Sequence, residues 1–336
     1  MHQRNLIVLL SILWALTGCV PSKQEETAYD KMRSLLDSLE VSTIDSLEFI
    51  TIQLKKDLLY DKYTLEDQYE YQNKERRFQW DKIVNRLTYT EAIQLKKRTW
   101  GVLRNYRNGN GEAVVVPNFV RNAYGRVSDT LGVERYQSVP LYLPEDTTTA
   151  IRYGRDGWIV EVIDTLQGDF VTVKGVSLED TWKTPKRYVK TLGDTLVFNH
   201  VIVIDVTHQN ITTLEKQSPY WYIRSMNPAT TGRHRPPYAQ ETPTGLYLLQ
   251  EKKIKMYYLK DGTTALGGFA PYASRFTNGA YIHGVPVAHP GRSIIEYSYS
   301  LGTTPRSHMC VRNVSSHAQF IYDWGPINET LIYVID

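Results

Sequence analysis

The stretch "LVFNHVIVIDVTHQNITTLEK", residues 196–216, contains a run of valine and isoleucine, then a polar turn and a second segment that we expect to be a strand. Branched apolar residues of this kind favour a buried strand, and a short polar break favours a turn into a second strand. Downstream, "SSHAQFIYDW" (315–324) has helical spacing, and "ETLIYVID" (329–336) is typical of a closing strand. We therefore expect a mainly-β domain over residues 193–336.

Alternating patterns also precede this domain. The segments "EAVVVPNFV" (112–120), "GWIVEVID" (157–164) and "DFVTVKGV" (169–176) predict short strands, separated by turn signals. The segment ends with "WKTPKRYV" (182–189), and this closing pattern resembles a bacterial Src-homology-3-like barrel. The resemblance implies a wall-binding β-barrel over residues 111–192, and a β-spacer that only positions the next domain is the open alternative.

Residues 19–110 show a different pattern, with few glycines. "WDKIVNRL" (80–87) places apolar residues on one helical face, and Thr88 with Glu91 suggests the start of another helix. We therefore predict a helical region that acts as a module or stalk. The predicted fold class is multidomain: a helical N-terminal region, a small β-barrel and a mainly-β C-terminal domain.

Near its start the chain has a short polar segment with Arg4, followed by an apolar run from Leu6 to Leu16. This run is too short to span a bilayer as a helix. Residues 1–18 therefore predict a signal peptide. The sequence Leu16 to Cys19 fits a lipobox, and its resemblance to bacterial lipoprotein signals implies a lipid on Cys19. Val20 after it favours the outer membrane, so we expect a lipid-anchored protein of the cell envelope that faces the periplasm.

Charge and cysteine content narrow the function further. The net charge is only +3, with basic and acidic residues interspersed, so the sequence gives no sign of nucleic-acid binding. The chain has two cysteines. If Cys19 carries lipid, Cys310 has no disulfide partner, and a free thiol in an exported protein is either buried and inert or reactive.

Three motifs in the C-terminal domain bear on whether the Cys310 thiol is inert or reactive. They are Thr242-Pro243-Thr244-Gly245, the pair His283-Gly284, and "RSHMCVRN" (306–313). In this order and together they resemble the L,D-transpeptidase family, also called YkuD, across roughly residues 195–336. The resemblance implies acyl transfer on peptidoglycan stem peptides, with no metal and no cofactor.

The resemblance also implies roles for individual residues. Cys310 is the nucleophile, His283 is its base, aligned through the carbonyl of Gly284, and His308 shapes the cysteine loop. The reverse assignment of the two histidines stays open. A further set is implied to bind substrate or the oxyanion: Gly284, Ser307, Met309 and Arg312.

Met309 departs from the family pattern, which has glycine at this position. A positive φ would strain a methionine by about 1–3 kcal/mol. We expect an ordinary φ instead, which leaves the backbone N–H groups of Met309 and Cys310 free to bind an oxyanion.

Several alternatives remain at this point. The same nucleophile can pass the acyl group to water, which gives hydrolysis of stem peptides or of links between wall and protein. The chain can also be a wall-binding lipoprotein without catalysis, in which Met309 blocks the oxyanion site. A zinc centre formed by His283, His308 and Cys310 has the right ligand types.

Overall fold

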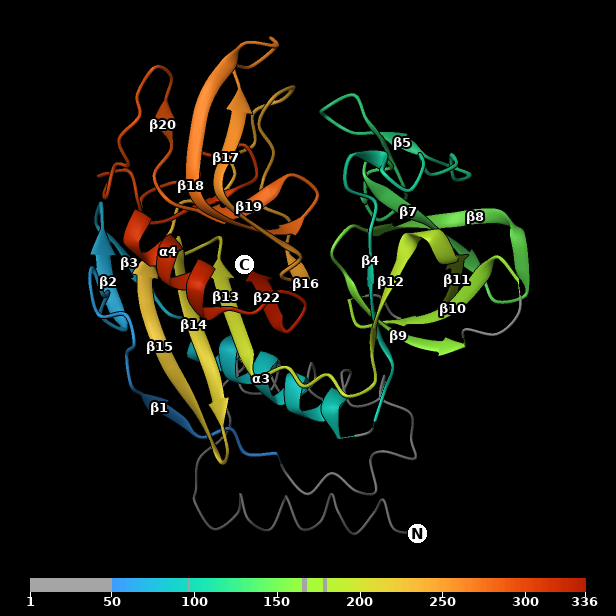
Figure 1. The fold of residues 1–336 in the computed structure, drawn as a ribbon, viewed down its shortest axis with the longest axis horizontal. Coiled ribbons are helices and arrows are strands. Elements are labelled where there is room, and N and C mark those ends of the chain that lie inside the picture. Colours follow the sequence, from blue (N-terminus) through green and yellow to red (C-terminus); the bar gives the residue numbers. More distant parts are fainter. Residues whose placement is uncertain (1–49, 96, 165–167, 178–179) are drawn as a thin grey trace. The chain divides into compact units, whose positions relative to one another are not determined.

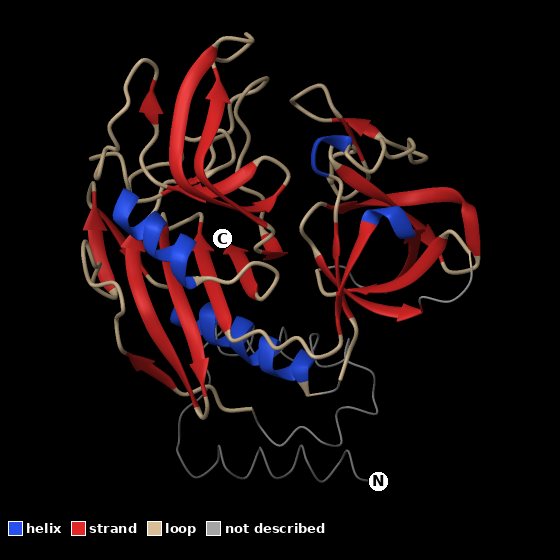
Figure 2. Ribbon diagram, in the orientation of Figure 1, coloured by secondary structure: helices blue, strands red, loops and turns tan. Residues whose placement is uncertain are grey.

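The computed structural model describes residues 50–336, apart from residues 96, 165–167 and 178–179. Most of this part of the chain is β-structure (Figure 2). The described residues contain two α-helices, α3 (Trp80–Gln94) and α4 (Ser315–Trp324). Neither is long and apolar enough to cross a membrane. The predicted signal peptide and Cys19 lie outside the described residues.

The expected strand pair at residues 196–216 forms the centre of a six-stranded sheet (Figure 1). The strand β13 (His200–Asp205) pairs antiparallel with β14 (Asn210–Gln217) and parallel with β22 (Thr330–Ile335), the closing strand of the chain. The sheet order is β1-β15-β14-β13-β22-β16. The other three strands are β15 (Tyr220–Pro228), β16 (Gly245–Leu248) and β1 (Leu54–Lys56). The predicted strands and the helix α4 are thus confirmed.

Both faces of this sheet are covered, which explains why the paired strands β13 and β22 are largely apolar and buried. Tyr333 of β22 points toward α3, where its hydroxyl lies 2.8 Å from Oγ1 of Thr90. Because side chains alternate along a strand, Ile332 and Val334 point the other way. They join a core that includes Ile321 of α4.

A second, smaller sheet packs against the other side of α4 and carries much of the site described below. Its order is β17-β18-β19-β21, with β20 paired to β18. Its strands are β17 (Glu251–Leu259), β18 (Leu266–Thr277), β19 (Ala280–His283), β20 (Val287–Ala288) and β21 (Val311–Arg312). The short strand β21 pairs parallel with β19 and so places the cysteine motif beside the His-Gly motif.

A seven-stranded antiparallel sheet separates α3 from β13 in the sequence, with the order β12-β4-β9-β10-β11-β7-β8. Its strands are β4 (Trp100–Leu103), β7 (Ser138–Leu143), β8 (Asp146–Arg155), β9 (Ile159–Asp164), β10 (Phe170–Gly175), β11 (Thr181–Pro185) and β12 (Val189–Gly193). The expected strands at 157–164 and 169–176 are confirmed as β9 and β10. In the expected strand at 112–120, only Val120 is in a strand, the first residue of β5 (Val120–Arg121), which pairs with β6 (Val127–Ser128). The likeness of this sheet to a Src-homology-3 barrel stays a prediction.

The predicted helical N-terminal region is wrong for the described residues 50–79. They contain β1 and a hairpin of β2 (Gln68–Tyr71) and β3 (Lys74–Arg77). Gln72 and Asn73 at the hairpin turn both have positive φ, 50° and 59°, the conformation that lets a two-residue turn follow the twist of its strands. Asparagine is the common residue in such turns, but no glycine marks this one in the sequence. The helix predicted at residues 80–87 is real, but Thr88 lies inside it and donates to the carbonyl of Val84, so it does not start another helix.

The turn between β8 and β9 joins the seven-stranded sheet to the rest of the core. Gly157 at this turn has a φ of 88°, and a Cβ there would lie 1.9 Å from the carbonyl oxygen of Phe276. The carbonyl of Gly157 accepts a 3.0 Å hydrogen bond from the N–H of Leu248. Only glycine allows this close approach of the two backbones. Beside it, Asp156 is fully buried and ion-paired to the buried Arg275 at 2.7 Å.

Candidate active site

The loop that carries Cys310 is held on two sides by backbone pairing. On one side β21 pairs with β19, and Asn313 donates its N–H to the carbonyl of His283 at 2.8 Å. On the other side Arg312 and Thr230 exchange two hydrogen bonds of 2.9 Å. The loop is therefore held by backbone hydrogen bonds on both of these sides.

Thr242, the first residue of the Thr-Pro-Thr-Gly motif, anchors the cysteine loop from a third direction. Its hydroxyl oxygen accepts a 2.8 Å hydrogen bond from the N–H of Gly232 and donates to the carbonyl of Met309, also at 2.8 Å. Gly232 passes so close that a Cβ on it would lie 2.7 Å from Cα of Met309. The motif, which has the composition of a simple turn, thus fixes the residue before the nucleophile.

Met309 has a φ of 90°, so the expectation of an ordinary φ is wrong. This conformation is the one that glycine adopts without strain. The contacts of Thr242 and Gly232 hold the backbone there although the side chain is methionine, at a cost of about 1–3 kcal/mol. Among the backbone hydrogen bonds of the described residues, none uses the N–H of Met309 or Cys310. Both N–H groups therefore remain available to an oxyanion.

His283 is buried at the end of β19, and its ring is fixed by one hydrogen bond. Nδ1 donates to the carbonyl oxygen of Gly284 at 2.6 Å, which leaves Nε2 as an acceptor. Burial lowers the pKa of His283 to about 4, so the imidazole is neutral at physiological pH. Gly284 itself packs against α4, since a Cβ on it would lie 2.6 Å from Oγ of Ser315. The expected alignment of His283 by Gly284 is present in the structure.

His308 lies apart from this arrangement. Its side chain is exposed, and Nε2 lies 3.0 Å from Oδ2 of Asp261 in the turn after β17. The geometry therefore distinguishes the two histidines: the ring of His283 is buried and held by Gly284, whereas that of His308 is exposed and paired with Asp261. For the zinc alternative, no three histidine, cysteine or acidic side chains within the described ranges converge to hold a metal ion.

Cys310 is the free cysteine of this site and is partly exposed. Its Sγ lies 3.5 Å from the carbonyl oxygen of Gly279, in the turn between β18 and β19. Burial raises the pKa of the thiol, although the backbone N–H of Tyr281 and the charge of Arg312 act in the opposite direction. Burial therefore favours the uncharged form of both the Cys310 thiol and the His283 imidazole.

Three arginines gather near the cysteine loop, and the charge of one of them, Arg312, acts on the Cys310 thiol. Arg233 and Arg306 lie close enough to lower the pKa of Arg312, after burial, which is the larger cause. The Nε atoms of Arg312 and Arg233 are buried and have no hydrogen-bond partner within the described part of the chain. Ser307 has a structural role, since its hydroxyl donates to the carbonyl of Cys310.

Residues far away in the sequence also position the site, and sequence reasoning missed them. Asp156 accepts a 3.0 Å hydrogen bond from the N–H of Asn278, which directly precedes Gly279. Arg76 of β3 donates to the carbonyls of Gly302 and Thr303, before the cysteine loop. No local signal marks either residue, because each acts through a contact more than one hundred residues away along the chain.

Comparison with known proteins agrees with this arrangement. Residues 199–334 match the family model of the L,D-transpeptidase catalytic domain, YkuD. No curated protein matches the chain significantly.

Solved structures show partial likeness. An L,D-transpeptidase from Mycobacterium tuberculosis H37Rv is 18% identical, with a TM-score of 0.33 over 55% of this chain and 92% of its own. One from Mycobacterium smegmatis is 16% identical, with a TM-score of 0.33 over 53% of this chain and 82% of its own. A fused zinc-dependent amidase, peptidase and peptidoglycan-binding-domain protein from Clostridium acetobutylicum is 18% identical, with a TM-score of 0.30 over 40% of this chain. The chain spans about half of that protein, 51% of its length. These scores are too low to carry an argument, so the assignment rests on the family model.

Proposed function

We propose that this protein transfers acyl groups between peptidoglycan stem peptides through a thioester on Cys310, because residues 199–334 match the family model of the L,D-transpeptidase catalytic domain. The observation that carries the proposal is the pairing of β19 with β21. This pairing brings a fixed, neutral His283 and a free thiol to neighbouring strands.

The proposed reaction has two stages. Cys310 attacks the carbonyl between the diamino acid and the terminal D-alanine of a donor stem, and the thiol proton passes to Nε2 of His283. The N–H groups of Met309 and Cys310 hold the oxyanion, and the proton then moves to the departing amine of D-alanine. The amine of a second stem attacks the thioester, forms the new amide and releases the thiol.

The arginines around Cys310 fit an anionic substrate. Arg312 has a buried Nε without a partner among the described residues, and Arg233 shares this feature. A guanidinium binds a carboxylate with two parallel hydrogen bonds, and stem peptides carry free carboxylates. In the proposal, this group orients the donor stem before attack.

The location of the protein is part of the proposal. A lipid on Cys19 would hold the chain at the membrane, with the outer membrane favoured by Val20, and would place the catalytic domain in the periplasm near the wall. Labelling cells with a radioactive fatty acid tests this directly, because Cys19→Ala should remove the label from the protein. A label that persists in this variant would refute lipidation at Cys19.

The test of activity uses the full-length protein in detergent with a disaccharide-tetrapeptide from peptidoglycan, and mass spectrometry of the products. Crosslinked dimer from the wild type, absent with Cys310→Ala, is the expected result. Release of D-alanine without dimer would assign hydrolysis by the same nucleophile. An unchanged substrate, with no acyl-enzyme mass on the protein, would refute the catalytic proposal.

A further inference from the structure

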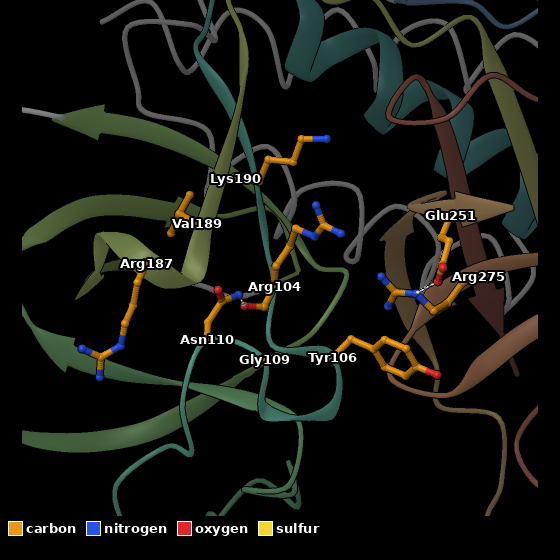
Figure 3. A pocket seen from close by; sticks show the side chains of 9 residues that line it. All are labelled: Arg104, Tyr106, Gly109, Asn110, Arg187, Val189, Lys190, Glu251 and Arg275. Carbon is orange, nitrogen blue, oxygen red and sulfur yellow. Dashed lines mark hydrogen bonds and ion pairs between the residues drawn. The ribbon is translucent and has the colours of Figure 1, made fainter.

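A cavity of about 420 Å³ lies between the seven-stranded sheet and the catalytic domain. Figure 3 shows Arg104, Lys190 and Tyr106 reaching into this region from one side, and the ion pair of Glu251 with Arg275 on the other. A cavity of this volume is in the range that small ligands and peptide segments occupy. None of the three sequence motifs contributes to its wall.

The acidic groups at this cavity are already neutralised. Glu251 accepts from Nε of Arg275 at 3.1 Å and from Nζ of Lys253, also at 3.1 Å. Arg275 is paired in addition with the buried Asp156. These four side chains therefore sum to no net charge.

The remaining cations of the wall have no acidic partner. Arg104, Arg187 and Lys190 take part in none of the ion pairs of the described residues. Burial lowers the pKa of Lys190, and repulsion from Arg104 lowers it further, so these two charges lie close together. An anion between them would offset this repulsion, so the charges of the cavity wall favour the binding of an anion.

The cavity is also next to the catalytic cysteine, with Tyr281 of β19 as the link. The hydroxyl of Tyr281 lies 3.3 Å from Oε2 of Glu251 and 3.4 Å from the hydroxyl of Tyr106, which lines the cavity. The backbone N–H of the same residue faces the Cys310 thiol. Tyr281 therefore connects the two places, with its backbone at the cysteine and its hydroxyl at the cavity wall.

From the unpaired cations, the volume and the position beside Cys310, we propose that this cavity binds a carboxylate of a peptidoglycan stem peptide. The inference rests on the proposed function, because that function supplies the peptide. Arg104 and Lys190 contact the carboxylate, and Arg187 borders the opening with its guanidinium over the ring of Tyr188. The seven-stranded sheet thus contributes directly to substrate binding.

Isothermal titration calorimetry tests the proposal in the full-length Cys310→Ala variant, so that no turnover occurs. The probe is a synthetic stem tetrapeptide with free carboxylates. The double change Arg104→Gln and Lys190→Gln should weaken its binding by roughly tenfold or more, because two charge-assisted contacts are lost. The matched control is Lys174→Gln with Lys183→Gln, on β10 and β11, which removes the same charge outside the cavity wall and should leave binding within about twofold of the parent.

Two further ligands identify the anion. The same peptide with its carboxylates amidated should bind the parent protein as weakly as the acid binds the double variant. Inorganic phosphate at millimolar concentration should not displace the peptide. Equal binding by the double variant and the control, equal binding of acid and amide, or displacement by phosphate would each overturn the proposal.

The activity assay separates this inference from the proposed function. If the wild type forms an acyl-enzyme and the Arg104→Gln, Lys190→Gln double variant binds peptide normally, only the cavity assignment fails. If binding depends on the cavity but no acyl-enzyme forms in the wild type, the cavity stands as a wall-peptide site and the catalytic proposal fails.

Discussion

Asp156 offers a sharp test of how the seven-stranded sheet supports the active site. Its Oδ2 accepts hydrogen bonds from Nη1 of Arg275 at 2.7 Å, from the N–H of Asn278 at 3.0 Å and from Nε2 of Gln250 at 3.2 Å. Its Oδ1 accepts from the N–H of Asn105 at 2.8 Å. The carboxylate is therefore surrounded by donors on both oxygens, and the whole group is buried.

We predict that Asp156→Asn destabilises the protein strongly while leaving its shape almost unchanged. Both carboxylate oxygens of Asp156 accept hydrogen bonds. In either orientation of the asparagine amide, its NH₂ group therefore stands where an accepting oxygen was and faces an N–H donor. Among the ion pairs of the described residues, the buried guanidinium of Arg275 then keeps the one with Glu251, which is partly exposed. Breaking a buried ion pair from one side costs about 3–5 kcal/mol, and we expect a loss of that size in the free energy of unfolding.

The matched control is Glu112→Gln, which removes an exposed partner of Arg135 at 3.3 Å. Exposed pairs contribute about 0–1 kcal/mol, so this change should have a small effect. Urea denaturation of both variants measures the free energies of unfolding.

A second readout follows the site itself. Asn278 precedes Gly279, whose carbonyl lies 3.5 Å from Sγ of Cys310, so Asp156→Asn should also change the alkylation rate of the thiol in folded protein. A stability loss below about 1 kcal/mol, equal to that of Glu112→Gln, would refute the reasoning.

Three further predictions concern the cysteine loop, the Cys310 thiol and the turn between β8 and β9. Thr242→Val should lower acyl transfer at least about tenfold, because the N–H of Gly232 and the carbonyl of Met309 both lose their hydrogen bond to the Thr242 hydroxyl. Thr242→Ser keeps the hydroxyl and should retain most activity in the dimer assay. The alkylation rate of Cys310 should keep rising with pH beyond the ordinary thiol pKa of about 8.5, since burial raises the pKa of this thiol and only the thiolate reacts; a plateau below pH 7 in an iodoacetamide titration would contradict this. Gly157→Ala should lower the melting temperature far more than Gly125→Ala, because both glycines have positive φ but only the first would clash with a neighbouring backbone; equal shifts in a thermal scan would count against the docking contact.

The parts of the fold that the sequence predicts are those with local signals. The strands β13 and β22 appear as apolar runs, β14 follows the polar turn after β13, and α4 has its helical period. The His-Gly and cysteine motifs mark residues that the structure brings to neighbouring strands.

The failures have physical causes too. The hairpin of β2 and β3 lacks a glycine at its turn, so the composition of this region favours a helix although the chain forms two strands. The φ of Met309 is imposed by Thr242 and Gly232, which lie far away in the sequence and whose contact with it no local pattern reveals. Asp156 depends in the same way on Arg275, 119 residues downstream. Long-range contacts of this type require the folded structure.

The chain enters and leaves the seven-stranded sheet on two neighbouring strands. Its first strand β4 and its last strand β12 pair along their length, from Leu103 with Val189 to Trp100 with Gly193. Once this insert has folded, the segments before and after it emerge side by side. The intervening residues then behave as a short link, and the loop-closure entropy for docking α3 beside β13 falls accordingly. Early folding of the insert should therefore accelerate the docking of α3 onto the six-stranded sheet. A variant in which a short linker replaces the insert should keep α3 docked in the same place.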